Sequence, residues 1–307
     1  MKLLEELIKI PGASSDEGLV ADFLLNYIDQ YQSSWKTTPT IFHGDQFQDS
    51  IVLVFGKPKT VLFAHMDTIG FSVGYGKNLI KIGWPVLEDG VELVGQDRFG
   101  SIEASLLVTE EMDGHKEIQY IFDREIERGT ILTYKPNFRE TELFVQSSYL
   151  DNRLGVWAAL QVAENIENGV IVFSTYEEHG GNTIGAISKW LQSEYQIHQA
   201  LIADITWVTE GVEHHKGVAI SMRDSCLPRR SYLNRIIKLA ESSGVLFQLE
   251  VESSGGSDGS TLQKSDVNMD WCFIGAAEDF VHSPNEKVSK SDIQSMVQLL
   301  SYLMIHL

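Results

Sequence analysis

The sequence has few cysteines. The two present, Cys226 and Cys272, lie in dissimilar contexts and outside any Cys-x-x-Cys pair. A disulfide framework is therefore not expected, and a reducing, cytoplasmic compartment is the natural interpretation. Long apolar runs are also missing, since none approaches the roughly 20 residues of a membrane span. The N-terminal MKLLEELIKI carries Glu5 and Glu6 within its apolar stretch, so we expect no signal peptide.

Basic residues are scarce relative to acidic ones. The chain has 24 Lys and Arg against 43 Asp and Glu, and its net charge is −19. Such a surface repels phosphate backbones and anionic lipid, so neither nucleic acid nor a membrane surface is an expected partner. The surface charge does not fix the charge of a binding cleft, and we infer no substrate preference from it. The hydrophobic fraction of 43% is enough for a large core.

Strand and helix patterns alternate through most of the chain. The apolar segments 50–56 and 60–67 predict two strands, and the second is too apolar to have a wet face, which places it centrally. Ser14 and Glu17 have the spacing of a capping box ahead of an amphipathic helix. Further strands are expected at 169–176, 199–204, 245–251 and 268–276, and helices at 2–9, 154–166, 183–195, 229–244 and 289–305. This order predicts a three-layer α-β-α fold with a mixed sheet covered by helices on both faces.

Residues 71–147 differ in character. Short strand-like pieces alternate there with Gly, Asp, Lys and Arg, and only 103–112 has some helical spacing. We expect a small β-rich domain inserted at 71–147 between the two parts, 1–70 and 148–307, of a larger domain. Near the end of that domain, GGSDGS (255–260) predicts a turn before a helix capped by Asp258 or Ser260.

Acidic residues and histidines follow the predicted strands where each strand ends. Ligands gather at the carboxyl ends of strands in such folds, so these side chains should meet at one cleft. They are His65, Asp67, Asp151, Glu177, Glu178, Asp204 and His282. Carboxylate oxygens together with imidazoles are the ligand set of zinc, cobalt or manganese. The sequence therefore predicts a metal site at this edge of the sheet.

The adjacent glutamates in VIVFSTYEEHGG (170–181) sharpen that prediction. Two carboxylates at one strand end point different ways, so one can bind a cation while the other stays free as a base. Taken alone, each residue also has an ordinary interpretation: Asp151 as a helix cap, His65 as a core histidine, the glutamates as a solvated strand end. These interpretations weaken jointly, because all the residues fall at strand ends expected to face one cleft.

Six segments in this order and spacing resemble the tetrahedral-aminopeptidase family of dinuclear zinc exopeptidases, which includes glutamyl and deblocking aminopeptidases. They are AHMDTIGF, LDNRLG, STYEEHG, LIADIT, GGSDGS and FVHSPNE. The resemblance extends to KIPGASSDE near the start and to GVAISMRD (217–224), so it covers nearly the whole chain. It implies the zinc-exopeptidase fold with an inserted β domain, and two divalent metal ions, zinc or alternatively cobalt or manganese.

The resemblance also implies a role for each residue at the predicted site. Asp151 would bridge the two metals, with a cis peptide bond to Asn152. His65 and Asp204 would complete one metal site, and Glu178 and His282 the other. Glu177 would be the general base, and Asp67 would hold the tautomer of His65.

The activity implied is hydrolysis of N-terminal residues from short peptides. Homo-oligomers from a dimer to a dodecamer are expected, assembled through the inserted domain.

Two segments depart from the family pattern near the expected substrate pocket: the longer EEHGGNTIG loop, and Asp279–Val281 directly before His282. A related hydrolase of this fold (a dipeptidase, carboxypeptidase or N-acyl-amino-acid deacylase) is the alternative, and it would need a basic residue such as Arg153 or Arg223 to bind a substrate carboxylate. A metal-stabilised binding protein without turnover is less favoured, because Glu177 is present.

Overall fold

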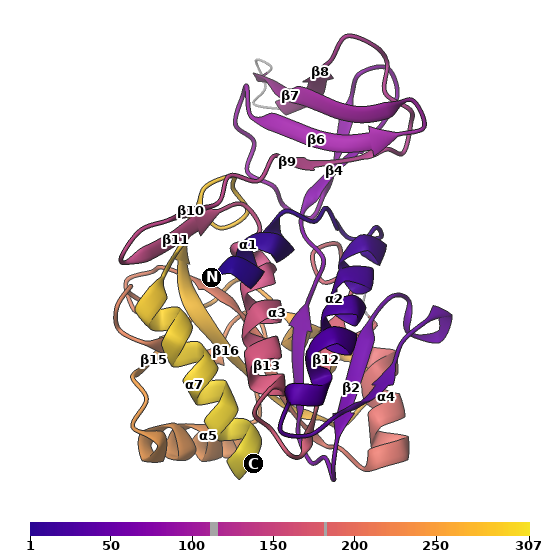
Figure 1. Ribbon diagram of the computed structural model, residues 1–307. Coiled ribbons are helices and arrows are strands. Elements are labelled where there is room, and N and C mark those ends of the chain that lie inside the picture. The colour runs from indigo at the N-terminus through magenta and orange to yellow at the C-terminus, as the bar shows by residue number, and fades with distance from the viewer. Residues whose placement is uncertain (111–115, 181–182) are drawn as a thin grey trace.

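The computed structural model describes residues 1–110, 116–180 and 183–307. Gly181 and Asn182 of the longer EEHGGNTIG loop therefore lie outside the described residues. The strands form one sheet of 11 and a second of six, and the second stands apart from the helices that cover the first (Figure 1). In the described part of the chain, no helix is long and apolar enough to cross a membrane.

The large sheet is mixed, and the strand predicted to be central lies in its interior. The order is β1 (Thr40–Phe42), β2 (Ile51–Phe55), β12 (Gly169–Ser174), β3 (Val61–His65), β13 (Gln199–Trp207), β16 (Asp270–Asp279), β17 (Glu286–Ser289), β11 (Phe144–Ser147) and β10 (Arg139–Glu140). Two more strands continue from β16, namely β14 (Val218–Arg223) and then β15 (Phe247–Val251). Because β12, β3, β13 and β16 run parallel, their carboxyl ends share one edge.

Helices cover both faces of this sheet, which confirms the three-layer α-β-α prediction. Along β3, Leu62 and Ala64 join one core and Val61 and Phe63 the other, as expected when alternate side chains point to opposite faces. The first core is closed by α1 (Lys2–Ile8), α2 (Gly18–Tyr31), α3 (Leu150–Ala163), α5 (Arg230–Ser243) and α7 (Lys290–His306). The second is closed by α4 (Ile184–Tyr195) and α6 (Asp258–Lys264). Short 3-10 turns occur at Gln32–Ser34 and Asp45–Phe47.

The second sheet is built from strands close together in the sequence and has its own apolar core. It comprises β4 (Gly70–Val73), β5 (Leu79–Ile82), β6 (Glu92–Asp97), β7 (Gly100–Glu110), β8 (Lys116–Ile121) and β9 (Ile131–Tyr134), in the order β5-β4-β9-β6-β7-β8. Phe71, Leu106 and Leu132 are among its buried residues. The last strands of the segment 71–147, β10 and β11, pair instead within the large sheet.

The helical spacing suggested for 103–112 is wrong over its described part. Residues 103–110 belong to β7, where Ile102, Ala104 and Leu106 are buried and the residues between them are not. This period of two, supported by pairing with β6 and β8, overrides the weaker helical spacing.

The predicted helix caps are also wrong. No side chain caps α2, which begins at Gly18, because the Ser14 hydroxyl donates to Asp67 instead. The cap of α6 is Ser257, whose side-chain oxygen accepts a hydrogen bond from the Gly259 N–H at 3.1 Å. Glycine at 259 fits a close approach there, since a Cβ would lie 2.4 Å from the Trp271 ring.

Candidate metal centre

The fold brings all seven predicted site residues to the shared carboxyl edge of the parallel strands. They come from five places: the end of β3 (His65, Asp67), the start of α3 (Asp151), the loop after β12 (Glu177, Glu178), the middle of β13 (Asp204) and the turn between β16 and β17 (His282). Five of them are buried, whereas Glu177 and His282 are partly exposed. Residues up to 217 positions apart in sequence therefore face one another, since the sheet order places these strands side by side.

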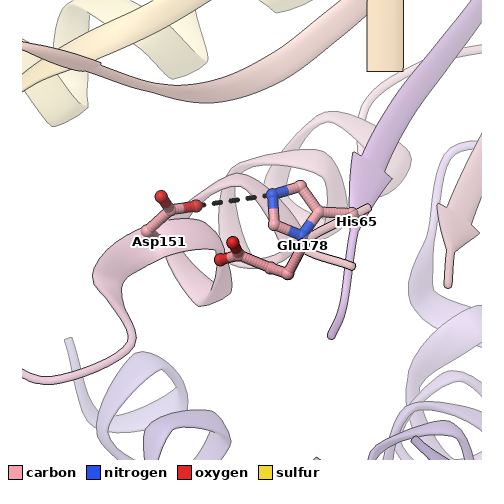
Figure 2. Close-up of side chains that lie close together, drawn as sticks. All are labelled: His65, Asp151 and Glu178. Carbon is pink, nitrogen blue, oxygen red and sulfur yellow. Dashed lines mark ion pairs between the residues drawn. The ribbon is translucent and has the colours of Figure 1, made fainter. Parts of the chain in front are cut away.

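Asp151 lies between two imidazoles. Its Oδ1 is 3.4 Å from Nε2 of His65, and its Oδ2 is 3.2 Å from Nε2 of His282. Figure 2 shows the first of these contacts, with the Glu178 carboxylate beside it. One carboxylate thus presents each of its oxygens to a different histidine.

Each imidazole also faces a second carboxylate. Nε2 of His65 is 3.6 Å from Oδ2 of Asp204, and Nε2 of His282 is 3.2 Å from Oε2 of Glu178. His65, Asp151 and Glu178 together offer ligand atoms that all lie within 4.8 Å of one another. The other oxygen of Glu178, Oε1, is buried and has no hydrogen-bond partner among the residues that the structure describes. This combination of nitrogen and oxygen donors with an unpartnered buried carboxylate oxygen fits a divalent cation.

The electrostatics of the cluster favour positive charge. Burial lowers the pKa of His282, but hydrogen bonds to Asp151 and Glu178 outweigh it and raise that pKa to about 12. Burial likewise opposes protonation of His65. The charge of Asp204 and hydrogen bonds to the neighbouring carboxylates outweigh it and raise the pKa of His65 well above its ordinary value. Burial raises the pKa of Glu178 to about 7 and that of Glu177 well above its ordinary value. Several carboxyl groups in a dry site are costly unless a cation neutralises them.

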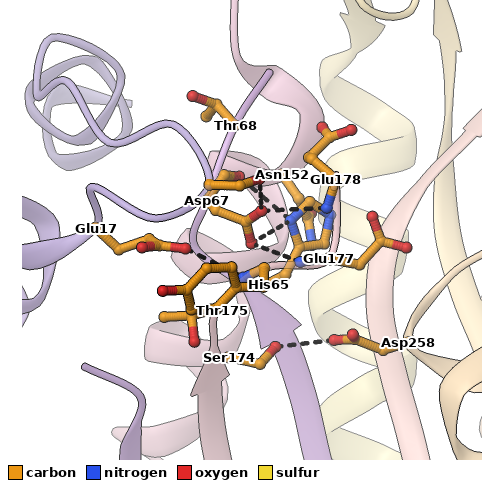
Figure 3. Close-up of polar contacts among 12 residues, drawn as sticks. Glu17, His65, Asp67, Thr68, Asn152, Ser174, Thr175, Glu177, Glu178 and Asp258 are labelled. Carbon is orange, nitrogen blue, oxygen red and sulfur yellow. Dashed lines mark hydrogen bonds and ion pairs between the residues drawn. The ribbon is translucent and has the colours of Figure 1, made fainter. Parts of the chain in front are cut away.

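Asp67 joins the end of β3 to the loop after β12. Its Oδ2 accepts hydrogen bonds from the Ser14 hydroxyl at 2.6 Å and from the Glu178 N–H at 3.1 Å. Its Oδ1 accepts from the Glu177 N–H at 3.1 Å and lies 3.5 Å from Nδ1 of His65 (Figure 3). Burial alone would raise the pKa of Asp67, but the contacts with His65 and Ser14 hold it below its ordinary value. The carboxylate of Asp67 therefore orients both glutamates, and the His65 ring is held by the Asp67 backbone carbonyl, 3.2 Å from Nδ1, together with that carboxylate.

The backbone next to the site adopts conformations that bulky residues seldom take. Tyr176, directly before the two glutamates, has φ of 67°, and His282 has φ of 63°. The Tyr176 N–H donates to the buried carboxyl of Glu17 at 3.1 Å, which helps to hold this turn. The peptide bond between Asp151 and Asn152 is cis, as the resemblance implied.

Several polar residues around the site were not predicted from the sequence. Glu17 is one, because its spacing from Ser14 suggested a helix cap. Glu286 is another, and its Oε2 accepts a hydrogen bond from the Asp151 N–H at 3.2 Å. Asp258 accepts one from the Ser174 hydroxyl at 2.8 Å, beneath the glutamate loop. The resemblance had already singled out the segments that hold them, KIPGASSDE, FVHSPNE and GGSDGS. Their position within these segments is therefore the sequence signal that could have identified them.

A cleft of about 790 Å³ opens beside the cluster. Asp151, Glu177, Glu178, Asp204 and His282 line it. Their polar atoms are therefore accessible from solvent through the cleft, and a peptide can approach them.

Comparisons with known proteins show which proteins the chain resembles. Residues 114–299 match the sequence profile of the M42 glutamyl aminopeptidase family. A curated protein of Acetivibrio thermocellus named "Putative aminopeptidase" is 25% identical over 97% of this chain and 96% of its own length. Among solved structures, aminopeptidase APDkam598 from the archaeon Desulfurococcus kamchatkensis has a TM-score of 0.84 at 19% identity, covering 100% of this chain and 94% of that one. The TET1 peptidase of Pyrococcus horikoshii, which can assemble into a tetrahedron or a large octahedral shell, has a TM-score of 0.83 at 19% identity, covering 100% and 99%.

Proposed function

The chain belongs to the M42 glutamyl aminopeptidase family, and on that premise we propose that it is a two-metal aminopeptidase acting on short peptides, with Glu177 as its general base. The observation that carries the proposal is the arrangement around Asp151. Each of its oxygens faces a different imidazole, and each imidazole faces a further carboxylate. This divides the ligands into two sets that share one residue.

The two sets would each hold a divalent cation. His65 and Asp204 would complete one site, His282 and Glu178 the other, and Asp151 would serve both. Zinc is the expected metal, with cobalt or manganese as alternatives that the same donors accept. When bound, such cations polarise a scissile carbonyl and lower the pKa of water to roughly 7 from about 16.

Glu177 is the residue we assign to proton transfer. Its backbone is fixed by Asp67, and Figure 3 shows its carboxylate pointing away from that of Glu178. The side chain lines the cleft and has no hydrogen-bond partner among the described residues. It is therefore free to accept a proton from the attacking water and to donate it to the leaving amine. Asp67 acts indirectly, by holding His65 and the glutamate loop in position.

The same-fold alternative, recognition of a substrate carboxylate, finds little support in the basic residues considered for it. Arg153 is fully buried and donates to the Ile10 carbonyl at 3.2 Å. Arg223 donates to the Asp224 carbonyl at 3.3 Å and does not line the cleft. Arg153 is therefore unavailable to a substrate carboxylate, and Arg223 lies outside the lining of the cleft.

We further propose that the chain forms homo-oligomers through the six-stranded sheet of the inserted segment 71–147, while 1–70 and 148–307, together with the strands β10 and β11 of that segment, form the catalytic domain. Several large apolar side chains of that insertion are exposed, among them Tyr75, Ile80 and Phe99. Exposed apolar groups that gather on one small domain are typical of contact surfaces. The cytoplasm remains the expected location.

Hydrolysis of matched peptides tests the function. Each peptide is prepared with a free or acetylated N-terminus and with a free or amidated C-terminus, and is assayed on metal-stripped protein before and after refilling with zinc. We expect metal-dependent cleavage of every free N-terminus, whatever the C-terminus. Glu177→Gln should lower kcat by about 100-fold or more while leaving bound zinc unchanged. Cleavage that needs a free C-terminus, or release of acetate, would instead assign the protein to the same-fold alternative.

A further inference from the structure

The cleft beside the candidate metal centre ends in carboxylates that take no part in that centre. Asp224 at the end of β14 and Glu250 and Glu252 at the end of β15 line it. Asp224 is 8% exposed and Glu250 is 4% exposed, whereas acidic side chains are seldom buried to that degree unless they are paired.

These carboxylates are not paired with cations inside the protein. Among the described residues, none of the three forms an ion pair with a Lys or Arg. One oxygen of Asp224 accepts from the Cys226 N–H, and one oxygen of Glu250 accepts from the Thr206 hydroxyl. The second oxygen of Asp224 has no hydrogen-bond partner among these residues, whereas the buried hydroxyl of Ser221 is close enough to Glu250 to lower its pKa. Burial raises the pKa of both groups: for Asp224 it outweighs the nearby charges of Arg223 and Lys264, and for Glu250 the charges of Asp224 and Glu252 add to it.

The position of this carboxylate group suits a substrate side chain next to the scissile bond. Thr206, which holds Glu250, lies two residues beyond the candidate ligand Asp204 on β13, so their side chains share one side of the strand about 6.6 Å apart. The four-carbon stem of lysine spans a distance of this order and carries its charge at the tip. Trp207, partly exposed in the same cleft, offers an apolar surface to the stem.

The part of the cleft wall formed by the buried Asp224 and Glu250 suits the first residue of a peptide and not the leaving part. The leaving peptide can have any length and needs a more open part of the cleft wall, such as that at Trp84, which is 77% exposed. The first residue ends the peptide, so only its side chain must fit the buried end near Asp224 and Glu250. A glutamate there would meet like charges, contrary to the glutamyl specificity that the family description names.

We infer that this aminopeptidase selects peptides whose first residue is lysine or arginine, through Asp224, Glu250 and Glu252. The inference rests on the proposed aminopeptidase function and adds its substrate class. A desolvated ammonium or guanidinium paired with these carboxylates contributes more than a surface ion pair would, because the surroundings are screened less by water.

The test uses zinc-loaded protein and amidated tripeptides X-Ala-Ala in which X is lysine, arginine, norleucine or glutamate. Norleucine has the stem of lysine without its charge, so the ratio of kcat/KM for lysine to that for norleucine isolates the cation. We expect a ratio of at least about tenfold, equivalent to about 1.4 kcal/mol, and the lowest kcat/KM for glutamate. Glu250→Gln and Asp224→Asn should each lower the ratio severalfold. Glu241→Gln, an exposed carboxylate on α5 outside the cleft, should leave it unchanged.

The outcomes separate this inference from the proposed function. If free N-termini are cleaved but kcat/KM for norleucine as the first residue equals or exceeds that for lysine, the basic preference is wrong and the proposed aminopeptidase function stands. A higher rate for Ala-Lys-Ala than for Ala-norleucine-Ala, without an effect at the first position, would overturn the placement of the cation. An unchanged ratio in both folded variants would overturn the role of these carboxylates. No cleavage of any free N-terminus by the zinc-loaded protein would overturn the proposed function and this inference with it.

Discussion

Replacing Asp67, which lies behind the candidate metal centre, by asparagine keeps the shape of the side chain but removes its charge. The wild-type carboxylate accepts from two backbone N–H groups, those of Glu177 and Glu178, and from the Ser14 hydroxyl, all at distances between 2.6 and 3.1 Å. Asparagine has almost the same shape but one acceptor oxygen, and its NH₂ group would face a donor. One buried N–H of the glutamate loop would then lose its partner.

The magnitude follows from these contacts. An unpaired buried N–H costs about 1–3 kcal/mol, so we expect Asp67→Asn to lower the free energy of unfolding by that amount. Loss of a group that orients a ligand typically lowers metal affinity or activity by about 10–100-fold. Because the Asp67 carboxylate fixes the backbone of both glutamates and lies 3.5 Å from Nδ1 of His65, we expect kcat/KM to fall by at least about 10-fold even at saturating zinc.

The assay combines urea unfolding with kcat/KM on a peptide with a free N-terminus, measured across a zinc titration. Ser14→Ala is the matched control, since it removes one donor but leaves the carboxylate bonded to both backbone amides. The lost hydrogen bond goes to a charged carboxylate, so we expect that control to lower the free energy of unfolding by about 1.5–3 kcal/mol but to keep kcat/KM within about threefold of the wild type, because both glutamate amides stay bonded. A folded Asp67→Asn protein with wild-type zinc affinity and kcat/KM would refute this account of how the site is held.

Other consequences can be measured on the same protein. Removing metal with a chelator should abolish peptide hydrolysis and lower Tm, because several buried carboxylates would lose their counter-charge; adding zinc should restore both, and an unchanged Tm would contradict the metal assignment. Gly155→Ala should destabilise the protein by about 1–3 kcal/mol in urea unfolding, since its Cβ would lie 2.2 Å from Oδ1 of Asn152 and 2.5 Å from the Ala203 carbonyl. Gly18→Ala has no atom within 4 Å of the new Cβ and should instead be neutral or stabilising by up to about 1 kcal/mol.

Much of the fold could be predicted because hydrophobic periodicity reflects burial. The run that became β3 is buried at every position, and a strand buried on both faces must lie inside the sheet. The wrong predictions came where residues that fit a local sequence pattern form tertiary contacts instead. Ser14 and Glu17 satisfy the spacing of a helix cap, yet their side chains bond to Asp67 and to the Tyr176 N–H, which no local rule contains.

The candidate ligands could be named in advance because parallel strands deliver their ends to one edge, so order along the chain is enough to group them. The cleft carboxylates could not be grouped in this way. β14 pairs antiparallel with β16 and parallel with β15, so Asp224 and Glu250 reach the cleft from strands beside the parallel set. A sequence with 43 acidic residues does not say which of them face imidazoles and which face a hydroxyl or a backbone N–H. That difference in partners separates the carboxylates proposed to bind metal from those proposed to select a basic residue, and it exists only once the chain has folded.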